Sequence, residues 1–187
     1  IVPNSERNGS AMRAYPIGIL DTETKVLDKT ELQARITHDT EWGVWSAQAI
    51  ALSAHFFLYK KGAKVQLTQY LEDWQQIKWP INWQGEVPMK GKETVEAVLS
   101  LVVQGDRMSK ILMEAVNLGG DADTVASLAL ALSSVCPEIE KDLPDWMFEQ
   151  LENGPYGRSF IEELDQKFLA LMPGVGAVLP SFVNRNL

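Results

Sequence analysis

The chain has 187 residues, of which 45% are hydrophobic and 22% are charged, and its formal net charge at pH 7 is −8. This length suits a single domain with a core of ordinary size. Nucleic acids and anionic membranes bind clustered Lys and Arg, so an acidic chain argues against either as a partner.

The start of the chain gives a mixed pattern. Residues 1–27 contain several turn-forming residues and no clear period. From Lys29 onward apolar residues recur at helical spacing, which predicts a short helix over 31–37. Helical structure is therefore expected to dominate only after the first 27 residues.

The longest stretch without a charged residue lies at 42–59. Its pattern predicts a long apolar helix over 44–61, with Thr40 as a candidate N-cap and Gly62 as its end. The stretch also carries polar residues such as His55, so we expect a buried core helix and not a membrane span.

The rest of the chain alternates helical patterns with turn-forming loops. Asp106 is a candidate cap for one helix, and Gly119 is a candidate stop signal. The helix from Thr124 is rich in Ala, Ser and Leu, which allow close packing, so we expect it at the centre. Runs of β-branched residues are too few for a sheet, which predicts an all-α fold, a compact multi-helix orthogonal bundle. The predicted helices lie at 65–77, 94–105, 106–120, 121–136, 144–153 and 156–172, with a loop at 77–91.

The single cysteine, Cys136, excludes an intramolecular disulfide bond. Proteins with so few cysteines are typical of a reducing compartment, so we expect a cytoplasmic location. Because Cys136 lies in an apolar run, a core position is expected for it and not a catalytic role.

An unusual pair of acids occurs in the stretch NLGGDADTVASLALA at 117–131. Asp121 and Asp123 are two residues apart, and such residues do not share a face inside a regular helix. At a helix start the backbone is still turning, and Gly119 and Gly120 permit positive φ angles there. Both carboxylates can therefore converge on one point.

Thr124 adds a hydroxyl oxygen to the acid pair. Three hard oxygens suit Mg²⁺, which uses one or two carboxylates and keeps several waters. The competing interpretation is structural, since Asp is a preferred N-cap and acids near a helix start interact well with its dipole. Local chemistry leaves both interpretations open.

Four stretches of the chain resemble the ADP-ribosylglycohydrolase family, which includes the dinitrogenase reductase-activating glycohydrolases. NLGGDADTVASLALAL is similar to its C-terminal signature, in which Gly-Gly and Asp-x-Asp-Thr enter a helix of small residues. SERNGSAMRAYPIGIL at 5–20 is similar to its Asn-Gly-x-x-Met-Arg loop. ARITHDTEWGVWSAQAIAL at 34–52 resembles its Thr-His segment, and LENGPYGRSFIEELDQKF at 151–168 resembles its closing helices.

The resemblance implies an all-helical hydrolase that binds two Mg²⁺ ions, or Mn²⁺ in some members. It would cleave the glycosidic bond between ADP-ribose and a protein side chain or small molecule. By their positions in the motif, Asp121, Asp123 and Thr124 are implied metal ligands, with the two aspartates as catalytic residues. The residues implied in binding ADP-ribose are Ser5, Asn8, Gly9, Ser10, Met12, Arg13, His38, Gly119 and Gly120.

The chain departs from the family pattern at its beginning. In the family, an earlier Thr-Asp-Asp-Thr segment completes the metal site, and no such segment precedes Ser5. The chain also starts with Ile1 and not with Met. We therefore expect residues 1–187 to form a single helical domain that is the C-terminal part of a longer ADP-ribosylglycohydrolase-like domain. Completion of the site by a second chain, and a reduced relative that does not hydrolyse, remain alternatives.

Other functions are also possible for this pattern. The superfamily includes a lens crystallin, so a structural or ADP-ribose-binding role without catalysis is the main alternative. A helical metal phosphohydrolase, suggested by His38-Asp39, would need an upstream histidine, and the only other one, His55, lies downstream. Arg13 as a surface ion-pair residue and His38 as a capping or core residue also remain open.

Overall fold

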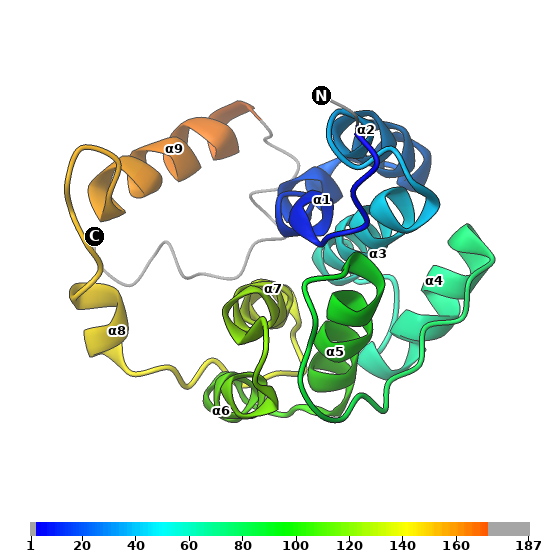
Figure 1. Cartoon of the computed structure of the whole chain (residues 1–187). Coiled ribbons are helices and arrows are strands. Elements are labelled where there is room, and N and C mark those ends of the chain that lie inside the picture. Colours follow the sequence, from blue (N-terminus) through cyan, green and yellow to red (C-terminus); the bar gives the residue numbers. More distant parts are fainter. Residues whose placement is uncertain (1–2, 172–187) are drawn as a thin grey trace. The chain divides into compact units, whose positions relative to one another are not determined.

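The computed structural model of the protein describes residues 3–171, and its contacts divide the chain into two compact units, Ile1–Lys141 and Asp142–Leu187. All regular secondary structure within the described residues is helical (Figure 1), which confirms the predicted all-α fold. Isolated β-bridges join some of the loops. The helices between residues 3 and 171 are too short or too polar to cross a membrane.

The first unit begins with more helix than the sequence pattern predicted. It contains α1 (Gly9–Met12), a 3₁₀ helix η1 (Tyr15–Ile19) and α2 (Glu23–Arg35). The start of α2 is marked by Thr22, whose side chain accepts the Lys25 N–H at 3.4 Å. The short helix predicted over 31–37 corresponds to the last part of α2, which begins earlier, at Glu23. The earlier start was not predicted because α2 buries only a narrow stripe of Val26, Thr30 and Ala34, which gives a weak period.

Helix α3 (Glu41–Leu58) forms the centre of the first unit. Every residue in it except Glu41, Trp42 and Trp45 is buried. It packs against α1, η1, α2, α4, α5 and α7 (Figure 1). The predicted cap is confirmed, because Thr40 Oγ1 accepts the Gly43 N–H at 3.0 Å. The expected central position of the helix at Thr124 was wrong, because the longer apolar helix has more area to bury on all sides.

Helix α7 (Ala122–Val135) packs beside α3 and also contacts α5 (Gly91–Gln104) and α6 (Met108–Leu118). Gly119 ends α6 as predicted. Asp106 is not its cap, because Arg107 takes the N-cap position and the Asp106 carboxylate instead lies 3.9 Å from Lys110 Nζ.

The end of α7 is held by a lysine. Lys141 Nζ donates to the Ile139 carbonyl at 2.7 Å and also to the carbonyls of Ser133 and Cys136. A cation at this position satisfies carbonyls at a helix C-terminus. Cys136 is buried, as expected for a core residue.

The remaining elements are short or lie in the second unit. In the first unit, η2 (Lys64–Gln66) leads into α4 (Leu67–Gln75), within the amphipathic segment predicted at 65–77. In the second unit, the structure has α8 (Asp145–Glu149) and α9 (Arg158–Leu171). The last position of the helix predicted over 156–172 lies outside the described residues.

Candidate functional site

A tight turn between α6 and α7 sets the position of the acid pair. Gly119 and Gly120 have φ angles of +75° and +66°, which favour glycine. The turn is fastened to Val87, whose carbonyl accepts the Asp121 N–H at 2.8 Å and whose N–H donates to the Gly119 carbonyl at 3.3 Å. A Cβ atom on Gly120 would overlap the Val87 carbonyl oxygen. The backbone angle therefore favours glycine at both positions, and the close approach of Val87 requires it at Gly120.

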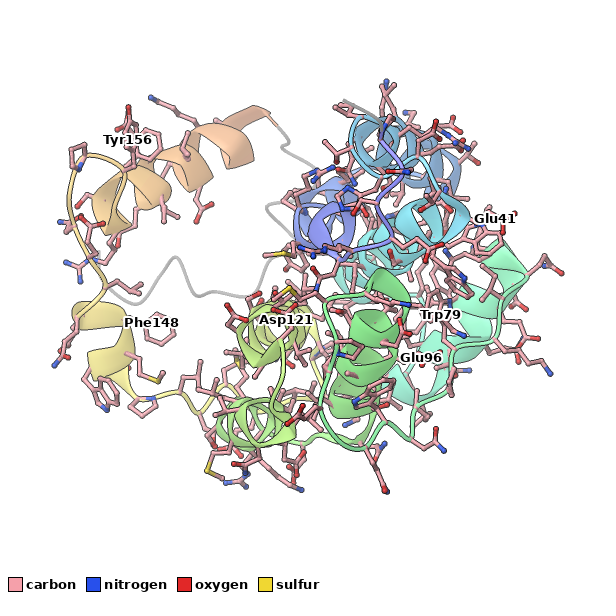
Figure 2. The ribbon with its side chains drawn as sticks, in the orientation of Figure 1. Glu41, Trp79, Glu96, Asp121, Phe148 and Tyr156 are labelled. Carbon is pink, nitrogen blue, oxygen red and sulfur yellow. The ribbon has the colours of Figure 1, made fainter. Side chains whose placement is uncertain are left out.

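Asp121 occupies the N-cap position of α7 without acting as a cap. Within the described residues its side chain bonds no N–H of α7. The carboxylate oxygen Oδ2 instead accepts a hydrogen bond from the side-chain amide of Asn8. Figure 2 labels Asp121 at the α7 end that faces α1 and α5. The predicted motif and the predicted Asn-Gly loop, 113 positions apart, thus meet directly.

The other two predicted metal ligands lie on the first turn of α7. Thr124 is only 4% exposed, and its hydroxyl donates to the Met12 sulfur at 3.8 Å. Because the hydroxyl is the donor in this bond, the bond does not use the oxygen lone pairs of Thr124. Asp121 is half-buried and Asp123 is exposed. Among residues 3–171, no Lys or Arg lies within ion-pair distance of Asp121 or Asp123.

Two serines of the loop serve mainly to fix it. Ser10 is fully buried, and its hydroxyl donates to the Gly43 carbonyl on α3 at 2.6 Å. The Ser5 carbonyl accepts the Thr40 hydroxyl at 3.2 Å, while its own hydroxyl accepts the Arg7 N–H at 3.2 Å. The loop is therefore attached to the first turn of α3 at both of its ends.

His38 lies against the glycine of the same loop. A Cβ atom on Gly9 would be 3.1 Å from the His38 ring, a tight contact that would require the imidazole to shift by a few tenths of an ångström. The Nδ1 atom of His38 lies 2.7 Å from the Thr37 hydroxyl. Burial lowers the pKa of His38, and the positive charge of Arg13 lowers this pKa further. Both effects favour the neutral form of the His38 imidazole.

Arg13 braces α1 against α2. Its guanidinium donates to the Gly9 carbonyl at 3.0 Å, to the Gln33 side chain at 2.6 Å and to the Thr37 hydroxyl at 2.5 Å. It also donates to the Gln33 carbonyl at 3.3 Å. All of these acceptors are neutral, so among the described residues Arg13 forms no surface ion pair.

Comparison with known protein families decides the family of the chain. The model of the ADP-ribosylglycohydrolase family matches residues 2–177. The chain belongs to the ADP-ribosylglycohydrolase family. A search of curated proteins gave no match. The resemblance found in the sequence motifs is thereby confirmed, and the family is one of hydrolases that bind ADP-ribosylated substrates.

Members of the ADP-ribosylglycohydrolase family are typically metal-dependent. In this chain the acid pair supplies two carboxylates, and Thr124 supplies a hydroxyl whose only described acceptor is a sulfur. These hard oxygens fit Mg²⁺ as part of its ligand set. Within residues 3–171 there is no group of three or more His, Cys, Asp and Glu side chains placed to hold a metal. The roles of Asp121, Asp123 and Thr124 as metal ligands therefore stay a prediction.

Two surface cavities of the first unit lie away from these residues. One, of about 360 Å³, is lined by Glu96 and residues of the loop at 80–84. The other, of about 480 Å³, lies between α2 and α3 and is lined by residues such as Glu41 and Trp45. None of the predicted site residues lines either cavity.

Two residues that contact the predicted site residues were not themselves predicted from the sequence. Val87 holds the glycine turn through its backbone, and Thr94 accepts an amide hydrogen of Asn8 at 3.0 Å. Val87 falls in a segment whose pattern indicated only a loop. Thr94 is 86 positions from Asn8, and no local pattern in the sequence indicates a contact over that separation.

Proposed function

We propose that this chain carries the metal-binding acid pair of an enzyme that hydrolyses the glycosidic bond between ADP-ribose and a protein side chain or small molecule. In this proposal Asp121, Asp123 and Thr124 bind Mg²⁺ or Mn²⁺. The supporting observation is the position of Asp121, whose carboxylate is held by Asn8 and does not cap its own helix. A carboxylate with a purely structural role at an N-cap position ordinarily caps its own helix.

The reaction requires stabilisation of positive charge at the anomeric carbon of the ribose, where a cation-like transition state develops. Bound Mg²⁺ would hold ribose hydroxyls and polarise a water molecule. Asp121 and Asp123 would favour the developing positive charge and accept a proton from the attacking water. Asn8 would keep the Asp121 carboxylate in one orientation.

The predicted ADP-ribose residues divide into two groups in this proposal. The Met12 sulfur accepts the Thr124 hydroxyl, and Gly9 lies against the His38 ring. We assign contact with ADP-ribose to Gly9, Met12 and His38. Ser10 and Arg13 bond to α3 and α2, so they act by holding the loop in place.

The proposed magnesium site needs ligands in addition to Asp121, Asp123 and Thr124. Mg²⁺ has six ligands, and the acid pair with Thr124 provides three oxygens. Waters, residues outside 3–171, or a second chain would complete the set, as expected for the C-terminal part of a longer domain. The alternative function, ADP-ribose binding without hydrolysis, is favoured by this partial set of ligands.

The test measures release of ADP-ribose from an ADP-ribosylated protein in the presence of Mg²⁺. We expect Asp123→Asn to lower the rate at least about 100-fold, because a metal ligand is lost. Removal of the metal with EDTA should have the same effect. Asp28→Asn, which changes an exposed acid on α2, is the matched control and should leave the rate unchanged.

Binding of ADP-ribose, followed by calorimetry, separates the two functions. Hydrolysis that is equal in the wild type and Asp123→Asn would contradict the ligand role. Binding of ADP-ribose by a wild-type protein that releases no product would favour the alternative function.

A further inference from the structure

A buried amide connects three elements beside the acid pair. Asn8, at the start of α1, is 6% exposed, and Thr94, on the first turn of α5, is fully buried. The Nδ2 atom of Asn8 donates to Thr94 Oγ1 at 3.0 Å and to Asp121 Oδ2 at the head of α7. Because a side-chain amide has two N–H hydrogens, these bonds use both of them.

The backbone places Thr94 firmly beside Asn8. The Glu6 carbonyl accepts the Gly91 N–H at 2.9 Å, and Arg7 forms an antiparallel bridge with Lys90. The segment that enters α1 is thereby fastened to the segment that enters α5. Thr94 follows within one turn, so its hydroxyl stays at a fixed place relative to the Asn8 amide.

We propose that Thr94 is a positioning residue for the metal site, because it holds the Asn8 amide in the orientation that draws Asp121 away from capping α7. This inference depends on the proposed metal role of Asp121. Thr94 acts through Asn8, since its own hydroxyl bonds the amide and not the carboxylate.

The physical reason is a competition for one carboxylate. An Asp at the N-cap position ordinarily accepts an N–H from the first turn of its own helix. The buried amide of Asn8 offers a competing donor, and its bond to the half-buried carboxylate is charge-assisted and therefore strong. If Thr94 no longer accepts the second amide hydrogen, the amide can rotate to find another partner. Asp121 would then turn to the N–H groups of α7 and would be less available to a metal.

The experiment measures Mn²⁺ affinity, through the electron paramagnetic resonance signal of free Mn²⁺, for Thr94→Val and Thr94→Ser. We expect the valine variant, which keeps the shape but lacks the hydroxyl, to bind Mn²⁺ about tenfold more weakly, in line with loss of one ordered hydrogen bond. The serine variant retains the acceptor and should stay within about twofold of the wild type. Thr94→Ala replaces the valine variant if the latter does not fold.

A double-mutant cycle with Asn8→Ala tests whether Thr94 acts through Asn8. In the Asn8→Ala protein, Thr94→Val should cause no further loss of Mn²⁺ affinity. Thr30→Val is the matched control, since Thr30 is fully buried in α2 and its hydroxyl has no hydrogen-bond partner among the described residues. It should leave Mn²⁺ affinity unchanged.

Wild-type affinity in Thr94→Val, or additive losses in the cycle, would overturn the inference. Hydrogen exchange at the N–H groups of residues 123 and 124 gives a second measure that does not need the metal. We expect Thr94→Val to slow this exchange as Asp121 becomes a cap, and unchanged exchange would also overturn the inference. If the wild type binds no Mn²⁺ but Thr94→Val still slows exchange at residues 123 and 124, the proposed function is contradicted. The role of Thr94 in positioning Asp121 is then still supported.

Discussion

The starts of α3 and α7 use the same kind of residue in opposite ways. Each helix follows an oxygen-bearing side chain at its N-cap position. Thr40 bonds the Gly43 N–H of its own helix at 3.0 Å, whereas Asp121 accepts its hydrogen bond from Asn8. The first side chain stabilises a helix, and the second is held away from one by a residue far along the chain.

The surroundings of the two helices explain this difference. Helix α3 is buried along most of its length, and its first turn also secures the loop through the bond from Thr40 to the Ser5 carbonyl. At the start of α7, by contrast, Asp121 is half-buried and Asp123 is exposed. An N-cap bond is typically worth about 1 kcal/mol. Because Asp121 does not form that bond, its carboxylate is left accessible for a ligand.

The largest expected effect comes from breaking the turn that presents Asp121. Gly120→Ala forces a residue with a Cβ atom into positive φ and against the Val87 carbonyl. The strained φ angle of residue 120 and the displacement of the Val87 backbone should together lower the free energy of unfolding by about 3 kcal/mol, measured by urea unfolding. Gly85→Ala is the control, because Gly85 also has positive φ but a Cβ atom added there would meet no other atom within 4 Å. Equal losses in the two variants would show that the contact with Val87 is unimportant.

A smaller effect should distinguish the two N-cap residues. Thr40→Ala removes a true cap and should lower the free energy of unfolding by about 1 kcal/mol or somewhat more. Asp121→Asn keeps the size and an acceptor for Asn8, so its loss of stability should be below about 0.5 kcal/mol. Mn²⁺ affinity should fall at least about tenfold in Asp121→Asn and remain near the wild-type value in Thr40→Ala. The reverse pattern would mean that Asp121 is the structural residue of the two.

The smallest effect concerns the far end of α3, where a buried histidine makes stability depend on pH. His55 is fully buried, its Nδ1 donates to the Gly18 carbonyl at 3.1 Å, and its Nε2 has no hydrogen-bond partner among the described residues. Burial lowers the pKa of His55, although the nearby Glu23 carboxylate opposes this shift. The folded state therefore binds a proton less readily than the unfolded state, whose histidine has a pKa of about 6.5.

Stability from this group is fully present above that unfolded-state pKa and is lost as the pH falls toward the lower pKa of the folded protein. Urea unfolding at pH 7 and pH 5 should show a smaller loss for His55→Gln than for the wild type. His38 has a pKa shifted in the same direction and remains in both proteins. An equal loss in the two proteins would mean that His55 does not contribute to the pH dependence.

Much of the candidate site could be predicted because its parts are short motifs. The glycine pair, the acid pair and the Asn-Gly loop each lie within a few residues, and the family they indicate is confirmed. The structure adds how these parts are used. It shows Ser10 bonded into α3 and Arg13 bonded to α2, where the motif alone suggested contact with ADP-ribose. The start of α2 was missed because its buried stripe is too narrow to give a strong period.

The amino-acid sequence by itself determined the helical class, the cap at Thr40 and the glycine stop after α6. These features depend on interactions between residues within a few positions of one another, so a local pattern is enough to specify them. Tertiary structure alone decided that Asp121 bonds Asn8, and that Asn8 bonds Thr94, across separations of 113 and 86 positions. Such bonds form only after helices have packed, because packing brings distant donors and acceptors together and excludes the water that would otherwise bind them.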